Sequence, residues 1–155
     1  MWRMEVERKF LVRSLPSGWR ATAGSQIRQG YFLLCRKDVE IRLREKGSQY
    51  FVTIKSGRGR FRLEEEIRIS RKRFEVLWPL VRPASIVKTR YRIPSGGRPI
   101  EIDVYAGRHR GLMTAEVEFP SAHSTKGFEP PSWLGREITG KRRYANESLA
   151  RRGHI

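Results

Sequence analysis

Residues 85–105 read SIVKTRYRIPSGGRPIEIDVY and contain two runs in which charged and apolar side chains alternate. The charged members of the two runs are Lys88, Arg90, Arg92, Glu101 and Asp103. Successive side chains of a β-strand point to opposite faces, so each run has one ionised face and one apolar face. Proline, serine and glycine separate the runs, as is typical of a turn. The segment predicts two antiparallel strands.

The same alternation recurs along the whole chain and predicts about eight strands. Their expected extents are 3–12, 26–34, 38–46, 49–56, 61–69, 85–93, 99–105 and 112–119. Ser70 can cap a helix that ends near Pro79, between the fifth and sixth strands. Shorter helical pieces are expected at 121–128 and 143–151. Gly57 and Gly59 indicate a hairpin turn, because no Walker-type helix signature follows them.

The ionised strand faces have two explanations. An open sheet could leave them wet and pack its apolar face on helices. Alternatively, the strands could close with the charged faces inward, and eight strands are enough for a barrel. Two like charges about 4 Å apart repel by up to about 4 kcal/mol at an effective dielectric near 20, so clusters of carboxylates or of cations need counterions. We therefore predict an α+β fold, an eight-stranded antiparallel β-barrel with a charged tunnel, outward apolar faces and a few flanking helices.

Composition indicates one domain over residues 1–155, since the charge is spread along the chain and no linker is visible. The net charge of +17 favours an anionic partner. No signal-peptide segment or membrane span is expected, because Glu5, Glu7, Arg8 and Lys9 interrupt any apolar run near Met1. Cys35 is the single cysteine, which fits a reducing compartment. We expect a cytoplasmic protein with no membrane partner.

The charged positions suit a polyanion held together with a hard metal ion. Oxygen-only ligands favour Mg²⁺ or Mn²⁺ over zinc or copper, and the candidates are Glu5, Glu7, Glu116 and Glu118. Lysine and arginine donate charge-assisted hydrogen bonds to phosphate oxygens. The candidate phosphate-binding residues are Lys9, Arg42, Arg44, Lys55, Lys88 and Arg90.

These residues follow one another in the order of a known family. The chain resembles the CYTH domain, or triphosphate tunnel metalloenzyme, through the E-x-E-x-K motif that Glu5 opens. Its downstream motifs are Arg42 and Arg44 in EIRLR, Lys55 in FVTIKSG, Glu64 and Glu66 in LEEEIRI, Lys88 and Arg90 in VKTRYRI, Asp103 in IEIDVYAG, and Glu116 and Glu118 in AEVEF. The resemblance spans nearly the whole chain and is greatest to small bacterial inorganic triphosphatases.

The resemblance implies metal-dependent hydrolysis of inorganic triphosphate to pyrophosphate and phosphate, with nucleoside triphosphates as possible further substrates. It implies that the four glutamates named above coordinate Mg²⁺ or Mn²⁺, and it adds Asp103 and Glu66 as candidate ligands. Tyr31 in RQGYF matches a proton acceptor that works beside the lysine matched by Lys55. By alternation Tyr31 and Arg28 face opposite ways, which leaves open whether Tyr31 points inward or is an outer aromatic.

Other functions remain open at this point. Within the family, class IV adenylyl cyclase and thiamine triphosphatase are alternatives, although the chain is near the minimal length for the barrel and leaves little room for a nucleoside site. A nucleic-acid-binding basic domain is a non-enzyme alternative. It is disfavoured because Trp2, Trp19, Trp78 and Trp133 fall at ends or in helical segments, away from any basic stripe. Monomer and homodimer are both compatible with the sequence.

Overall fold

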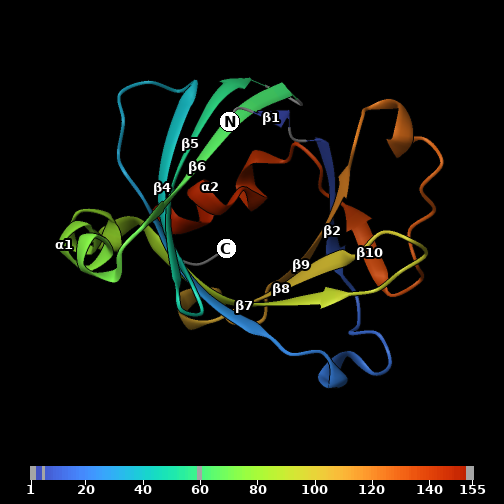
Figure 1. Cartoon of the computed structure of the whole chain (residues 1–155). Coiled ribbons are helices and arrows are strands. Elements are labelled where there is room, and N and C mark those ends of the chain that lie inside the picture. The colour runs from blue at the N-terminus through green and yellow to red at the C-terminus, as the bar shows by residue number, and fades with distance from the viewer. Residues whose placement is uncertain (1–2, 5, 59–60, 153–155) are drawn as a thin grey trace.

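A single antiparallel sheet of ten strands dominates the computed structural model (Figure 1), which describes residues 3–4, 6–58 and 61–152. The strands are β1 (Arg3–Met4), β2 (Val6–Val12), β3 (Ser25–Tyr31), β4 (Val39–Lys46), β5 (Gln49–Arg58), β6 (Phe61–Ile69), β7 (Ser85–Ile93), β8 (Ile100–Tyr105), β9 (Met113–Phe119) and β10 (Leu134–Glu137). The eight predicted strands are confirmed as β2 to β9. The short β1 and β10 are additions.

The sheet curls so that its two sides meet. Its hydrogen-bonded order is β1-β6-β5-β4-β3-β7-β8-β9-β2-β10. Met4 ends β1 at one side and Val6 begins β2 at the other, and two peptide bonds can separate their Cα atoms by only about 7 Å. The ladder itself does not close, because β10 occupies the second edge of β2 through the pairs Leu134 with Val12 and Glu137 with Phe10.

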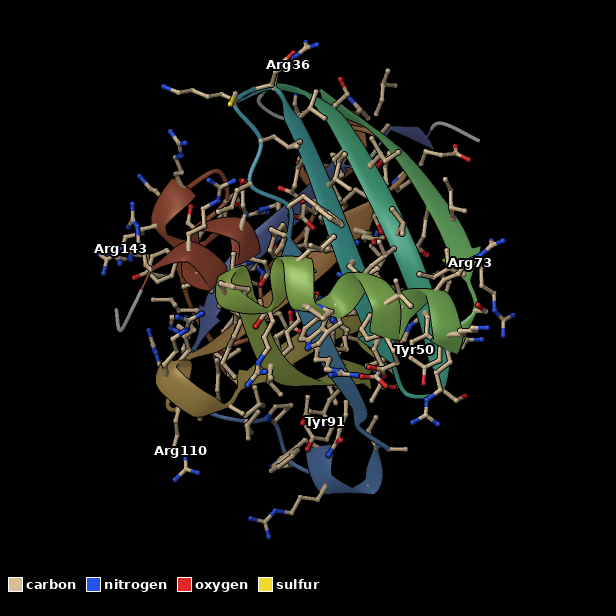
Figure 2. All side chains as sticks on the ribbon, turned by 90° about the vertical axis from the view of Figure 1, so that its left-hand side faces the viewer. Arg36, Tyr50, Arg73, Tyr91, Arg110 and Arg143 are labelled. Carbon is tan, nitrogen blue, oxygen red and sulfur yellow. The ribbon has the colours of Figure 1, made fainter. Side chains whose placement is uncertain are left out.

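Helix α1 (Arg71–Val81) covers the outer face of β4, β5 and β6, and Figure 2 shows it lying across these strands. Ser70 caps it as predicted, since its hydroxyl accepts from the backbone N–H of Arg73 at 3.3 Å. Phe74 and Val81 from the helix pack on Leu43 of β4. The predicted outward direction of the apolar faces is therefore confirmed on this side.

The outer face of β2, β8 and β9 packs into a second cluster around Phe10, Ile102 and Val117. Phe128 and Trp133, from the segment after β9, cover it. That segment contains the 3₁₀ helix η4 (His123–Thr125), which lies within one predicted helical piece. The remaining 3₁₀ helices are η1 (Trp19–Ala21), η2 (Arg82–Ala84), η3 (Gly107–His109) and η5 (Arg142–Tyr144).

The C-terminal helix α2 (Asn146–Arg151) lies on the inner face of the curled sheet, in the middle of the ring in Figure 1. Its Leu149 and Ala150 pack on Tyr31 and Tyr105, and the Tyr105 hydroxyl donates to Asn146 Oδ1 at 2.6 Å. Helix α2 thus covers one end of the interior. No helix within the described residues is long and apolar enough to cross a membrane.

Candidate active site

Cross-strand pairing places the residues predicted for the site on one face of strands β2 to β9. Directly paired residues have their side chains on the same side of a sheet. Arg42 pairs with Tyr31 on one side and with Thr53 on the other. The described residues of the predicted site all lie on this inner face: Glu7, Lys9, Tyr31, Arg42, Arg44, Lys55, Glu66, Lys88, Arg90, Asp103, Glu116 and Glu118. Glu5 lies outside the described residues.

Carboxylates gather at the end of the interior opposite α2. Glu7 pairs directly with Glu118, and Glu116 pairs with Glu101. A cavity of about 380 Å³ opens here, and Glu101, Glu116 and Glu118 line it. Carboxylates placed this closely repel unless a cation lies between them, which fits an oxygen-ligated divalent metal. Among the residues that the structure describes, no three acidic, histidine or cysteine side chains form a metal-binding group.

Glu116 already has two protein counterions. Its carboxylate accepts from Lys9 Nζ at 2.9 Å and from Arg90 Nη2 at 2.9 Å. Burial alone would raise the pKa of Glu116, but these two cations outweigh burial and hold the pKa well below its ordinary value. Glu116 therefore stays ionised, and its remaining lone pairs can still accept a metal ion.

Asp103 lies between two of the predicted phosphate-binding cations. Its Oδ2 accepts from Lys88 Nζ at 2.5 Å, and Arg90 reaches both of its oxygens at 2.7 and 2.8 Å. Asp103 and Lys88 are each 1% exposed. This geometry makes Asp103 the group that positions Lys88 and Arg90, while its assignment as a metal ligand remains a prediction.

Two arginines in the middle of the interior are incompletely satisfied. Arg42 donates to Thr53 Oγ1 at 3.2 Å and lies 3.9 Å from Glu66, but its buried Nε has no hydrogen-bond partner among the described residues. Arg44 donates to Gln29 Oε1 at 3.0 Å and makes no ion pair within the described chain. Burial and the neighbouring charges of Arg42 and Arg90 lower the pKa of Arg44 to about 10. Buried donors of this kind are suited to an anion.

Tyr31 faces the interior, so the alternative of an outer aromatic is wrong. Its side chain is 1% exposed, and its hydroxyl oxygen accepts from Gln29 Nε2 at 2.7 Å. Burial raises the pKa of Tyr31, with a further rise from Glu40, so the phenol keeps its proton near neutral pH. Lys55 lies on the same face but forms an ion pair with Glu64 at 3.2 Å.

Sequence reasoning left four residues of the interior and of the cavity at its open end out of the predicted site: Gln29, Arg92, Arg98 and Glu101. Gln29 links Arg44 to Tyr31, and Glu101 accepts from Arg90 Nη1 at 2.5 Å. The alternation after Arg90 already indicated that Arg92 and Glu101 face inward. Arg98 lies in the turn between β7 and β8, where alternation carries no signal.

Comparison with known proteins agrees with this geometry. A protein of Nitrosomonas europaea named inorganic triphosphatase is 43% identical over 148 residues, covering 94% of this chain and 96% of that protein. An inorganic triphosphatase of Acetivibrio thermocellus is 34% identical over 151 residues, covering 95% of this chain and 93% of that protein.

Solved structures show the same fold. A crystal structure of an inorganic triphosphatase superposes with a TM-score of 0.75 at 40% identity, covering 97% of each chain. A putative adenylate cyclase from Bacillus halodurans superposes with a TM-score of 0.60 at 17% identity, covering 79% of this chain and 84% of that one, which shows a shared fold alone. The CYTH domain family matches residues 3–153, and the chain belongs to this family.

Proposed function

We propose that the protein is an inorganic triphosphatase that hydrolyses tripolyphosphate to pyrophosphate and phosphate. The observation that carries the proposal is the pair of under-satisfied arginines, Arg42 and Arg44, on the same inner face of the curled sheet as a group of carboxylates. A polyanion bound together with a divalent cation would satisfy both regions, because the anion meets the arginines and the cation meets the carboxylates. The names of the two relatives that align over nearly the full chain support the same activity.

The cations of the inner face hold the substrate. Arg42 and Arg44 donate to phosphate oxygens, Lys9, Lys55 and Arg90 complete the positive lining, and Lys88 adds to it in its protonated form. Several of these cations already pair with carboxylates of the protein, which fixes their positions before substrate arrives. Positioning and charge neutralisation account for most of the catalysis of phosphoryl transfer.

The acidic corner, which is the group of carboxylates formed by Glu7, Glu101, Glu116 and Glu118 at the end of the interior opposite α2, suits Mg²⁺ or Mn²⁺. Glu7, Glu116 and Glu118 supply oxygen ligands, with Glu5 as a further candidate, and Glu66 and Asp103 remain weaker ones. A divalent ion bound there would neutralise phosphate charge and activate water. The balanced reaction joins the water oxygen to a terminal phosphorus, breaks its bridging P–O bond and releases pyrophosphate.

Tyr31 acts in this proposal as a neutral phenol that orients a phosphate oxygen or the attacking water. Its raised pKa opposes a role as a phenolate base, because the phenol loses its proton only well above neutral pH. The proton taken from water is released to solvent or to the departing pyrophosphate. Cys35 is an exposed free thiol, and we place the enzyme in the reducing cytoplasm, as a monomer or homodimer.

The proposal is tested with Glu118→Gln, which keeps the shape of the side chain and removes its charge. We expect metal-dependent phosphate release from tripolyphosphate to fall about 100-fold or more, since a group that acts on transition-state charge is lost. The matched control is Glu147→Gln on α2, which removes an exposed carboxylate paired with Arg151.

The substrate panel contains tripolyphosphate, ATP, thiamine triphosphate and pyrophosphate, each assayed with Mg²⁺ and with Mn²⁺. Tripolyphosphate should give the largest kcat/KM. A wild-type protein that releases no phosphate from tripolyphosphate with either ion, or a fully active Glu118→Gln variant, would contradict the proposal.

A further inference from the structure

Two arginines line the cavity at the open end of the interior without belonging to the set of cations described above. Arg92 and Arg98 form part of its wall, and Glu101, Glu116 and Glu118 form another part. Neither arginine makes an ion pair with any residue that the structure describes, whereas Lys9, Lys88 and Arg90 all do. Their charge is therefore available to a ligand in the cavity.

Arg92 extends the row of cations along β7. It follows Lys88 and Arg90 at two-residue spacing, and Glu101 lies opposite it in the backbone register of β7 and β8. Alternate residues of a strand are about 7 Å apart, so the row leads from the buried Lys88 outward to the exposed Arg92. An anion bound to Arg90 thus has the next positive charge one step toward the open end.

Arg98 is fixed by the turn that joins β7 to β8. Its backbone N–H donates to the Ser95 carbonyl at 2.9 Å, which closes a four-residue turn. The two central residues, Gly96 and Gly97, have φ of 52° and 82°, a conformation that glycine adopts without strain. The Arg98 guanidinium lies 5.2 Å from the centre of the Phe119 ring, a cation–π contact that holds the charge at the cavity wall.

We propose that Arg92 and Arg98 form an outer phosphate subsite that binds the end of the polyphosphate chain nearest the open side. This inference rests on the proposed function and deepens it, because it says which residues hold the outer phosphoryl group beside the acidic corner. Arg44 holds the inner part of the chain, and Arg92 and Arg98 hold the outer part. The subsite contributes to substrate affinity and leaves the chemical step unchanged.

The test uses Arg92→Gln, Arg98→Gln and the double variant of the full chain. The controls are Arg110→Gln, which removes an exposed arginine beyond η3, and Arg143→Gln, whose guanidinium stacks on Tyr144 at 5.0 Å much as Arg98 stacks on Phe119. Figure 2 shows Arg110 and Arg143 on the flank formed by η3 and by η5 with α2. Each control removes one positive charge, as the cavity variants do, but at a position outside the cavity.

Two readouts are measured for every variant: KM and kcat for tripolyphosphate with Mg²⁺, and the Kd of tripolyphosphate in EDTA by calorimetry. We expect each cavity variant to raise KM and Kd about tenfold, as for one lost charge-assisted hydrogen bond, with kcat within about twofold. Arg92→Lys should recover part of the lost affinity. The controls should stay within about twofold of wild type in all three quantities.

Several results would overturn the subsite. They are an unchanged KM and Kd, a KM that rises equally in the controls, or a kcat that falls while Kd stays constant. Thermal melting of each variant shows whether it is folded. If loss of the Arg98 contact unfolds the turn, the KM and Kd of Arg92→Gln alone test the subsite. A wild-type protein that fails to hydrolyse tripolyphosphate defeats the proposed function instead, and the calorimetric comparison still tests the subsite.

Discussion

Lys88 shows how the interior sets the properties of a single residue. It is fully buried and pairs with Asp103, yet burial lowers its pKa to about 7, with Arg90 acting in the same direction. The folded protein therefore releases this proton at a lower pH than the unfolded chain, whose lysine has a pKa of 10.5. Between these two values the unfolded state binds more protons, so the stability of the fold rises with pH.

This linkage predicts a pH-dependent difference between wild type and Lys88→Met. The wild-type free energy of unfolding should gain on the order of 1 kcal/mol per pH unit from this group between pH 7 and 9. The variant lacks the titrating group and should lack this part of the slope. Urea unfolding at pH 6, 7, 8 and 9 measures both. Parallel curves for the two proteins would show that Lys88 does not titrate in this window.

Tyr31 makes a second prediction at the same scale. Tyr31→Phe removes a hydroxyl that hydrogen-bonds Gln29 in the buried interior, and kcat for tripolyphosphate should fall about tenfold. Because burial raises the pKa of Tyr31, the pH profiles of the two proteins should keep the same shape up to pH 9. A wild-type rate that climbs tenfold per pH unit, and flattens in the variant, would indicate a phenolate base instead.

Helix α1 illustrates how an element outside the interior supports the element that carries the site. Arg28 points outward from β3, forms ion pairs with Glu45 and with Glu75 of α1, and stacks on Phe74 and Trp78 at 5.0 and 4.6 Å. Phe74 itself is fully buried. These contacts join the outer face of β3 and β4 to the helix, while Tyr31 and Arg42 on the same strands face the interior.

Phe74→Ala should therefore reduce stability far more than it changes catalysis. Loss of a buried aromatic costs about 3 to 5 kcal/mol, measured here as the change in free energy of unfolding in urea. Val76→Ala is the matched control, because Val76 lies on the same helix and is 70% exposed. Its cost should stay within about 0.5 kcal/mol. Equal losses in the two variants would mean that α1 is not anchored through Phe74.

For the molecule as a whole, most of the sheet could be predicted from the sequence, but the edge strand β10 and the position of α2 could not. Period-two alternation located β2 to β9 and the inner face, because each strand pairs an ionised face with an apolar one. It could not locate β10, a four-residue strand that exists because the edge of β2 is available. Nor could it place α2 inside the ring, since that depends on contacts with Tyr31 and Tyr105 from distant strands.

A ligand that binds the cations of the interior should also stabilise the entire fold. At a free tripolyphosphate concentration of 100 times Kd, binding adds about 2.7 kcal/mol, which raises the Tm of a chain of this size by roughly 5 to 10 °C. Differential scanning fluorimetry in EDTA, to prevent turnover, measures the shift. Sulfate at equal ionic strength is the control. An identical shift with sulfate would show that the interior does not recognise a polyphosphate chain.

The pairing of β2 with β9 and β10 delays the completion of the sheet during translation. Arg8 and Glu137, which form an ion pair, are 129 residues apart, and Figure 1 shows the dark blue β2 beside the orange β9 and β10. At about 5 to 20 residues per second, a ribosome needs roughly 5 to 20 seconds to extend the chain from β2 to β9. Throughout that interval a half-apolar strand carrying Val6 and Phe10 has no neighbour, so the nascent chain is most exposed to aggregation and chaperone capture before translation ends.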